Sequence, residues 1–200
     1  EEVLRRRDMR NILTFTVDPD DAKDFDDALS FQILDTGNYQ IGIHIADVTH
    51  YVQEGTVVDE EAYQRGTSIY LVDRVIPMLP ERLCNELCSL RPNEDKLCMS
   101  VIVEMDQHAK VIRHKICRTI IRSNHRLTYQ QAQTMLEEAK GGELSEALQT
   151  LNRLAKQLRT KRFEHGAINF ETPEVRFHLN EEGYPTDIIF AHSTDANHLI

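Results

Sequence analysis

The amino-acid sequence predicts an α+β fold, in which a mixed, mostly antiparallel sheet has helices packed on it. Two patterns lead to this prediction. Several segments that alternate apolar and polar residues are joined in pairs by short polar turns, which is typical of antiparallel hairpins. Two later segments repeat their apolar residues every three or four positions, as amphipathic helices do. The 200 residues, 40% of them hydrophobic, suffice for one ordinary core.

The first third of the chain is expected to hold a strand and a hairpin. Residues 12–17 form the strand, and Pro19 directly after it stops any helical continuation. Residues 28–34 and 39–45 then pair around Thr36-Gly37-Asn38, because apolar residues alternate with others in the second of these segments.

The middle of the chain predicts short elements. We expect a helix at residues 58–65 that ends at Gly66, an extended stretch at 68–72 and a helix from Pro80 to residue 87. Strands at 96–105 and 110–122 follow, on either side of a turn.

Helices and one more hairpin are expected in the last part. Thr128 and Gln131 form a capping-box pattern for a helix to about residue 140, where Gly141-Gly142 ends it. Leucines at helical spacing predict a second helix from residue 144 to Gly166. A hairpin at 174–179 and 186–190 comes next, and Ser193-Thr194-Asp195 is typical of a helix start.

No run of about 18 apolar residues occurs, and no apolar segment follows the basic start of the chain as in a signal peptide. We therefore expect a cytoplasmic protein. The four cysteines are interpreted as reduced structural thiols, since Cys84 and Cys88 have helical spacing rather than zinc-ligand spacing.

The net charge is −10, and the charged residues are distributed unevenly along the chain. Residues 11–63 contain twelve acidic residues and one base, whereas residues 107–136 contain six Lys or Arg and no acid. A second basic run lies at 153–162. This order fits a metal centre beside a track for phosphates, and ordinary solvated charge is the alternative interpretation.

The segment from Asp18 to Asp27 is the most informative, since six aspartates fall within ten residues directly after a strand. Crowded carboxylates repel one another unless cations neutralise them, and carboxylate oxygens favour Mg²⁺ or Mn²⁺. A calcium-binding EF-hand is excluded, because Ala22, Lys23 and Leu29 occupy positions where that loop needs an oxygen ligand, a glycine and a glutamate. An exposed acidic loop without metal is the remaining alternative.

This loop resembles the catalytic (RNB) domain of the ribonuclease II/ribonuclease R family. Further similar segments are Ile43-His44-Ile45-Ala46-Asp47-Val48, Ile76-Pro77-Met78-Leu79-Pro80, Ser89-Leu90-Arg91-Pro92-Asn93-Glu94 and Gly166-Ala167-Ile168-Asn169-Phe170. The sequence of the acidic loop, with Pro19 and Asp24-Phe25-Asp26-Asp27, is more similar to that of bacterial ribonuclease R than to that of ribonuclease II. The resemblance runs from about Arg5 to the end, so residues 1–200 are expected to form the N-terminal part of one RNB-type domain.

The resemblance implies a processive 3′-to-5′ exoribonuclease that hydrolyses single-stranded RNA to nucleoside 5′-monophosphates with Mg²⁺, or Mn²⁺ as a substitute. Asp18, Asp24, Asp26 and Asp27 match the family's catalytic, metal-binding carboxylates. Asp20 and Asp21 fall outside that pattern. Tyr70 and Phe170 match aromatic residues that stack on the terminal RNA bases; taken singly, core packing is the favoured interpretation of each. His44 is interpreted as structural.

The resemblance also implies that an arginine, a glutamate and flanking RNA-binding barrels lie outside these residues, so that the chain alone holds an incomplete site. Two other functions stay open at this stage. One is a non-catalytic RNA-binding member of the same family, and the other is a metal-dependent phosphodiesterase that acts on DNA or small phosphates.

Overall fold

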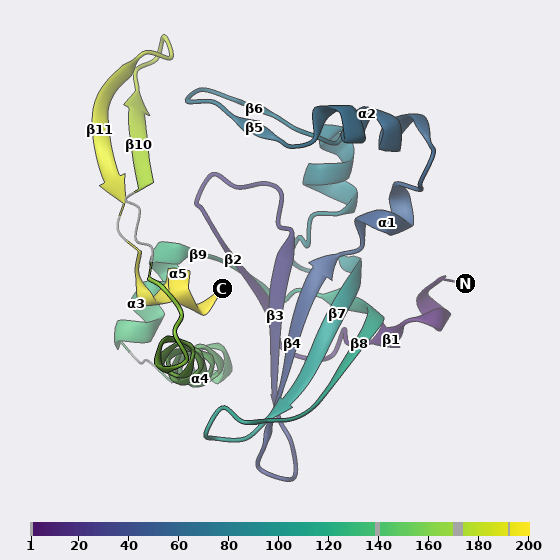
Figure 1. The fold of residues 1–200 in the computed structure, drawn as a ribbon, viewed down its shortest axis with the longest axis vertical. Coiled ribbons are helices and arrows are strands. Elements are labelled where there is room, and N and C mark those ends of the chain that lie inside the picture. The colour runs from purple at the N-terminus through teal and green to yellow at the C-terminus, as the bar shows by residue number, and fades with distance from the viewer. Residues whose placement is uncertain (1, 139–140, 170–173, 192) are drawn as a thin grey trace.

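A computed structural model describes residues 2–138, 141–169, 174–191 and 193–200. Its centre is a seven-stranded sheet (Figure 1). In sheet order the strands are β1 (Arg7–Asp8), β8 (Val111–Arg122), β7 (Asp95–Met105), β4 (Tyr39–Ala46), β3 (Asp27–Ile33), β2 (Thr14–Asp18) and β9 (His125–Thr128). The two edge strands run parallel to their neighbours and all other pairs are antiparallel. The predicted fold class is confirmed.

Strand β9 was not expected from the sequence. It has only four residues and is separated from β8 by two residues, so no alternating pattern marks it. Its parallel pairing with β2 places Arg126 opposite Thr16 and Thr128 opposite Asp18. A strand that is distant from β2 in the sequence but adjacent to it in space thereby brings Arg126 to the start of the acidic loop.

Three helices cover one face of the sheet on the side of β2 and β3: α3 (Tyr129–Glu138), α4 (Glu143–Glu164) and α5 (Asp195–Leu199) (Figure 1). The predicted capping box is present, since the Gln131 amide donates to Thr128 Oγ1 at 3.0 Å and Gln131 Oε1 accepts from the Thr128 amide at 2.9 Å. The larger core lies beneath these helices around Phe15, Leu148 and Leu151.

The helices leave part of this face uncovered. Ile41 is buried, but Ile43 and Ile45, which follow it on the same face of β4, are 41% and 49% exposed. The alternation that predicted this strand is therefore correct, whereas the burial that usually accompanies it is only partial. The reason is that α3, α4 and α5 lie toward β2 rather than over β4.

The opposite face combines a second core, which includes Met9, Phe25 and Leu90, with a buried polar network. His44 is fully buried between Ser30 Oγ at 2.9 Å from Nε2 and Ser100 Oγ at 2.7 Å from Nδ1. Gly42 makes room for this ring, because a Cβ there would lie 2.5 Å from His44 Nε2. Both ring nitrogens have partners, which confirms the structural interpretation of His44.

Smaller elements surround one end of the sheet, which carries the acidic loop and is uppermost in Figure 1. They are α1 (Val48–Tyr51), α2 (Val57–Arg65), the hairpin of β5 (Ile69–Tyr70) and β6 (Val75–Ile76), and η2 (Leu83–Leu87). Gly66 ends α2 in the left-handed conformation, as expected. The helix expected from Pro80 has π geometry from Leu83 to Leu87.

The remaining elements are η1 (Glu2–Arg5) and a hairpin of β10 (Glu174–Leu179) and β11 (Pro185–Ala191), which stands away from the sheet (Figure 1). All four cysteines are free thiols, as predicted. Among the described residues, no helix has the length and apolar character to cross a membrane.

Candidate catalytic site

The acidic loop joins the end of β2 to the start of β3, and both of its ends are fixed by the sheet. Asp18 is the last residue of β2 and Asp27 the first of β3. Between them, the side chain of Phe25 is buried in the second core. The four predicted metal ligands are therefore carried by a loop that is held at both ends and in the middle.

The structure brings the predicted carboxylates close enough to influence one another. The pKa of Asp18 is raised to about 6, chiefly by burial and also by repulsion from Asp27 and Asp24, while the nearby Thr16 hydroxyl and the Arg126 charge act to lower it. Burial likewise raises the pKa of Asp26, with added repulsion from Asp24 and Asp27. Burial raises the pKa of Asp27 as well. Half-buried carboxylates that repel one another attract a cation strongly.

Asp18 gives the most direct sign that a cation fits here. Its side chain is 8% exposed, and its Oδ2 atom is buried without a hydrogen-bond partner. A buried oxygen without a partner is costly unless something outside the protein binds it. Within the described residues, however, no group of three or more His, Cys, Asp or Glu side chains converges into a complete metal site. The donor set thus suits a hard divalent cation, whose coordination other oxygens would have to complete.

Two segments outside the loop form hydrogen bonds with its backbone. Ser89 Oγ accepts a hydrogen bond from the Phe25 amide at 3.0 Å and donates to the Lys23 carbonyl at 2.8 Å. The Leu90 amide donates to the Phe25 carbonyl at 2.8 Å, and the Ala46 amide donates to the Asp26 carbonyl at 2.9 Å. Two of the segments that carried the family resemblance therefore hold the backbone around the acidic residues.

Arg126 holds the first half of the loop. Its Nη2 atom donates to the Pro19 carbonyl at 2.6 Å and to the Asp20 carbonyl at 2.8 Å. The guanidinium lies over the ring of Phe25, 5.5 Å from its centroid. The sequence placed Arg126 in a basic run for phosphates, and its structural position instead makes it a loop contact.

Tyr70 lies above the same loop, on the β5–β6 hairpin. Its side chain is 69% exposed and its hydroxyl donates to Asp24 Oδ2 at 3.5 Å. An exposed ring is not part of the core, so the alternative interpretation of Tyr70 is wrong. Phe170, the predicted second aromatic, lies outside the described residues.

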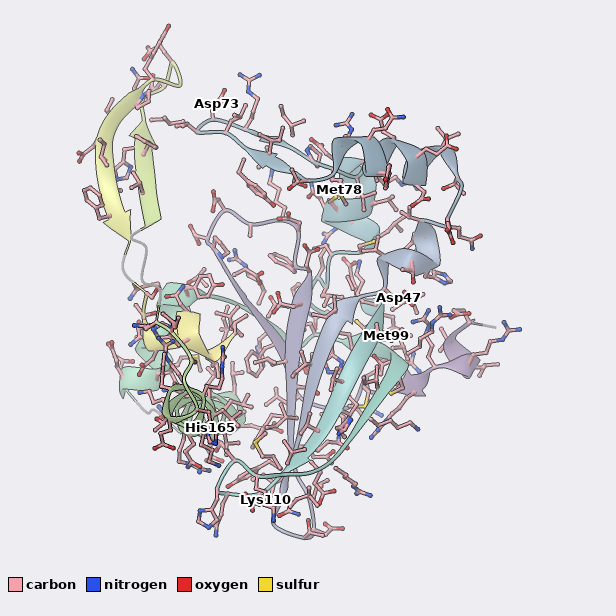
Figure 2. All side chains as sticks on the ribbon, viewed as in Figure 1. Asp47, Asp73, Met78, Met99, Lys110 and His165 are labelled. Atoms are coloured by element: carbon pink, nitrogen blue, oxygen red, sulfur yellow. The ribbon has the colours of Figure 1, made fainter. Side chains whose placement is uncertain are left out.

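The expected basic track is less continuous than the sequence indicated. Lys110, at the start of β8, lies at the end of the sheet opposite the acidic loop (Figure 2). Arg113 pairs with Glu104 at 2.6 Å and Arg122 with Asp95 at 2.6 Å. In the other run, Arg153 donates to the Gln107 carbonyl and Lys156 pairs with Asp195. Many of these charges stabilise the fold.

Another acidic residue of the resembling segments serves the fold as well. Asp47 is buried and pairs with Arg6 at 2.7 Å, and it also accepts from the Thr49 hydroxyl at 2.7 Å. It lies on the side of the sheet near the N-terminus (Figure 2). Sequence reasoning did not identify Ser89 and Arg126 as contacts of the acidic loop. Ser89 belongs to a segment that resembles the family, but the sequence gives no sign of its contacts. Arg126 is placed by strand β9, which has no periodic pattern in the sequence.

A loop of carboxylates on one end of a mixed sheet, beside an exposed tyrosine, defines a candidate metal-assisted hydrolytic site. The chain matches the RNB domain over residues 6–200, and it belongs to the RNB family. It is 41% identical to DIS3-like exonuclease 2 of Schizosaccharomyces pombe, covering all of this chain and 23% of that protein. It is 45% identical to ribonuclease R of Aquifex aeolicus, over 94% of this chain and 27% of the relative.

Solved structures agree with this assignment. Ribonuclease R of Mycoplasma genitalium in complex with ribose-methylated single-stranded RNA matches with a TM-score of 0.89 and 29% identity, over 98% of this chain and 31% of that one. Yeast Ssd1, a pseudonuclease, shares the fold with a TM-score of 0.72 and 21% identity, over 82% of this chain and 20% of that one. The fold therefore occurs with and without nuclease activity. The chain spans about a quarter of the length of the curated relatives named here.

Proposed function

We propose that the protein to which this chain belongs is a divalent-metal-dependent exoribonuclease that degrades single-stranded RNA processively from its 3′ end. Its products would be nucleoside 5′-monophosphates, and residues 1–200 would form the N-terminal part of its catalytic domain. Asp18, Asp24, Asp26 and Asp27 would hold Mg²⁺, or Mn²⁺ in its place. The observation that carries this proposal is the buried Oδ2 atom of Asp18, which has no hydrogen-bond partner, in a loop where Asp24 and Asp27 repel both Asp18 and Asp26.

The chemistry follows from the donor set. Bound divalent ions would activate a water molecule and stabilise the leaving 3′ oxygen of a phosphodiester. Four carboxylates on a fixed loop would set the position of these ions, and phosphate oxygens of RNA would complete their coordination. The exposed ring of Tyr70 would stack on a base near the RNA end, and stacking does not depend on base identity.

Metal removal tests this function directly. The full-length protein should shorten a 5′-labelled single-stranded RNA one nucleotide at a time from the 3′ end in Mg²⁺, and EDTA should stop the reaction. A denaturing gel follows the shortening, and mass spectrometry identifies the released nucleotides. Equal activity in EDTA, equal degradation of DNA, or release of nucleoside 3′-monophosphates would each refute the proposal.

Tyr70→Ala should change where degradation stops. The stacked base contributes about 1–3 kcal/mol to RNA binding, so the variant should release a longer limit oligonucleotide, while long RNA is still held by other contacts. End-labelled RNA on a denaturing gel measures both the limit product and the initial rate. Tyr63→Ala is the matched control, because Tyr63 is also exposed but lies on α2. An unchanged limit product for Tyr70→Ala would contradict the stacking role.

A further inference from the structure

We infer that Ser89 and Arg126 are positioning residues that fix the acidic loop before metal and RNA bind. This inference rests on the proposed function and extends it to two residues that are not carboxylate ligands. Neither is placed to bind the metal. Each acts through the loop backbone. Ser89 contacts the residues before and after Asp24, and Arg126 contacts the two residues that follow Asp18.

The Ser89 hydroxyl spans one acidic residue. It contacts the carbonyl of Lys23 and the amide of Phe25, so the backbone is fixed immediately before and after Asp24. Ser89 is fully buried, and the adjacent Leu90 amide binds the Phe25 carbonyl. Since the Ala46 amide also holds the Asp26 carbonyl, the direction in which Asp24 and Asp26 leave the backbone is set by contacts from outside the loop.

Arg126 does the same for the beginning of the loop. One guanidinium nitrogen binds two successive carbonyls, those of Pro19 and Asp20, and the group lies over the Phe25 ring. The Arg126 side chain is only 22% exposed. These contacts hold the backbone directly after Asp18, where the Ala22 amide also donates to the Pro19 carbonyl at 3.2 Å.

Such fixation is needed because the aspartates repel one another. Six aspartates lie within the ten residues from Asp18 to Asp27, and a loose loop would relieve their repulsion by spreading. Any spreading would have to be reversed when a metal binds, at a cost in metal affinity. Outer contacts that orient ligands typically change metal affinity about 10–100-fold.

The test uses the full-length protein and Mn²⁺ as the probe. Ser89→Ala should raise the half-saturating Mn²⁺ concentration, measured by electron paramagnetic resonance of free Mn²⁺, by about tenfold or more. In the metal-free protein, hydrogen exchange of the peptide covering residues 19–27 should become faster. Ser100→Ala is the matched control, since it also removes a buried hydroxyl with two partners, His44 and Thr119, but away from the loop. It should change neither quantity.

Arg126→Met separates positioning from charge. The Arg126 guanidinium contacts the loop directly after Asp18, so its positive charge by itself opposes a bound cation. If charge were its only effect, Arg126→Met would tighten Mn²⁺ binding, whereas positioning predicts weaker binding and faster exchange of the loop. Tighter binding, or weaker RNA binding with unchanged Mn²⁺ affinity, would overturn the role of Arg126.

The outcomes distinguish this inference from the proposed function. If Ser89→Ala matches Ser100→Ala in Mn²⁺ binding and loop exchange while the full-length protein remains a metal-dependent exonuclease, positioning by Ser89 is refuted and the function stands. If the wild-type protein shows no metal-dependent nuclease activity, the function itself fails. Circular dichroism of each variant checks that the fold is retained.

Discussion

Asp26→Asn in the full-length protein should lower turnover by about a thousandfold and leave RNA binding nearly unchanged. Removing a metal-binding charge costs several kcal/mol of transition-state stabilisation. Asp26 lies beside Asp24 and Asp27, and the Ala46 amide binds its backbone carbonyl rather than its side chain, so the loop backbone should survive the change. Single-turnover rates and RNA titrations on the same preparation measure the two quantities.

Asp20→Asn is the matched control for this prediction. It removes the same charge from the same loop, but the Asp20 side chain is 95% exposed, its carboxylate lies 4.0 Å from the Arg126 guanidinium, and the contact of its backbone carbonyl with Arg126 does not depend on that carboxylate. It should leave turnover nearly intact. Equal losses in both variants would mean that the loop acts through its overall charge. Full turnover in Asp26→Asn would remove the basis for metal binding there, and would favour a non-catalytic or differently catalysed protein of this fold.

Acid should destabilise the fold through His44. Burial lowers the pKa of His44 to about 4, from 6.5 for the free side chain. The unfolded chain therefore binds a proton at a higher pH than the folded one does, and stability falls as the pH drops below 6.5. The loss levels off below about 4, where the folded protein also takes up the proton. This single group accounts for ~3 kcal/mol.

Thermal unfolding of the full-length protein between pH 8 and pH 4 measures this effect. His44→Gln should be less stable than the wild type near pH 7, because the Ser30 and Ser100 hydroxyls lose well-placed partners. The difference between the two proteins should shrink as the pH falls, since glutamine does not titrate in this range. Parallel pH profiles for both would show that His44 is not the titrating group.

Local patterns were sufficient to predict most elements and all four carboxylates. The β3–β4 hairpin follows from its polar turn and alternating residues, and the caps of α2 and α3 follow from Gly66 and Thr128. These signals are local because turn geometry and helix capping depend on residues a few positions apart. The crowding of six aspartates in one loop indicated a cation, and the family resemblance selected Asp18, Asp24, Asp26 and Asp27 among them.

Contacts between distant residues could not be predicted in this way. Strand β9 forms only because β2 lies beside it, and Arg126 reaches the loop across more than a hundred residues of sequence. The contacts of Ser89 also join residues that are distant in sequence. The same holds for the ion pairs that Glu104 and Asp95 form with basic residues expected to bind phosphate. The sequence by itself therefore determined most elements through short-range periodicity, and it indicated the residues of the proposed chemistry through crowded charge together with the family resemblance. Only the tertiary structure decided what holds them in place, because hydrogen bonds and ion pairs depend on distance in space and not on separation along the chain.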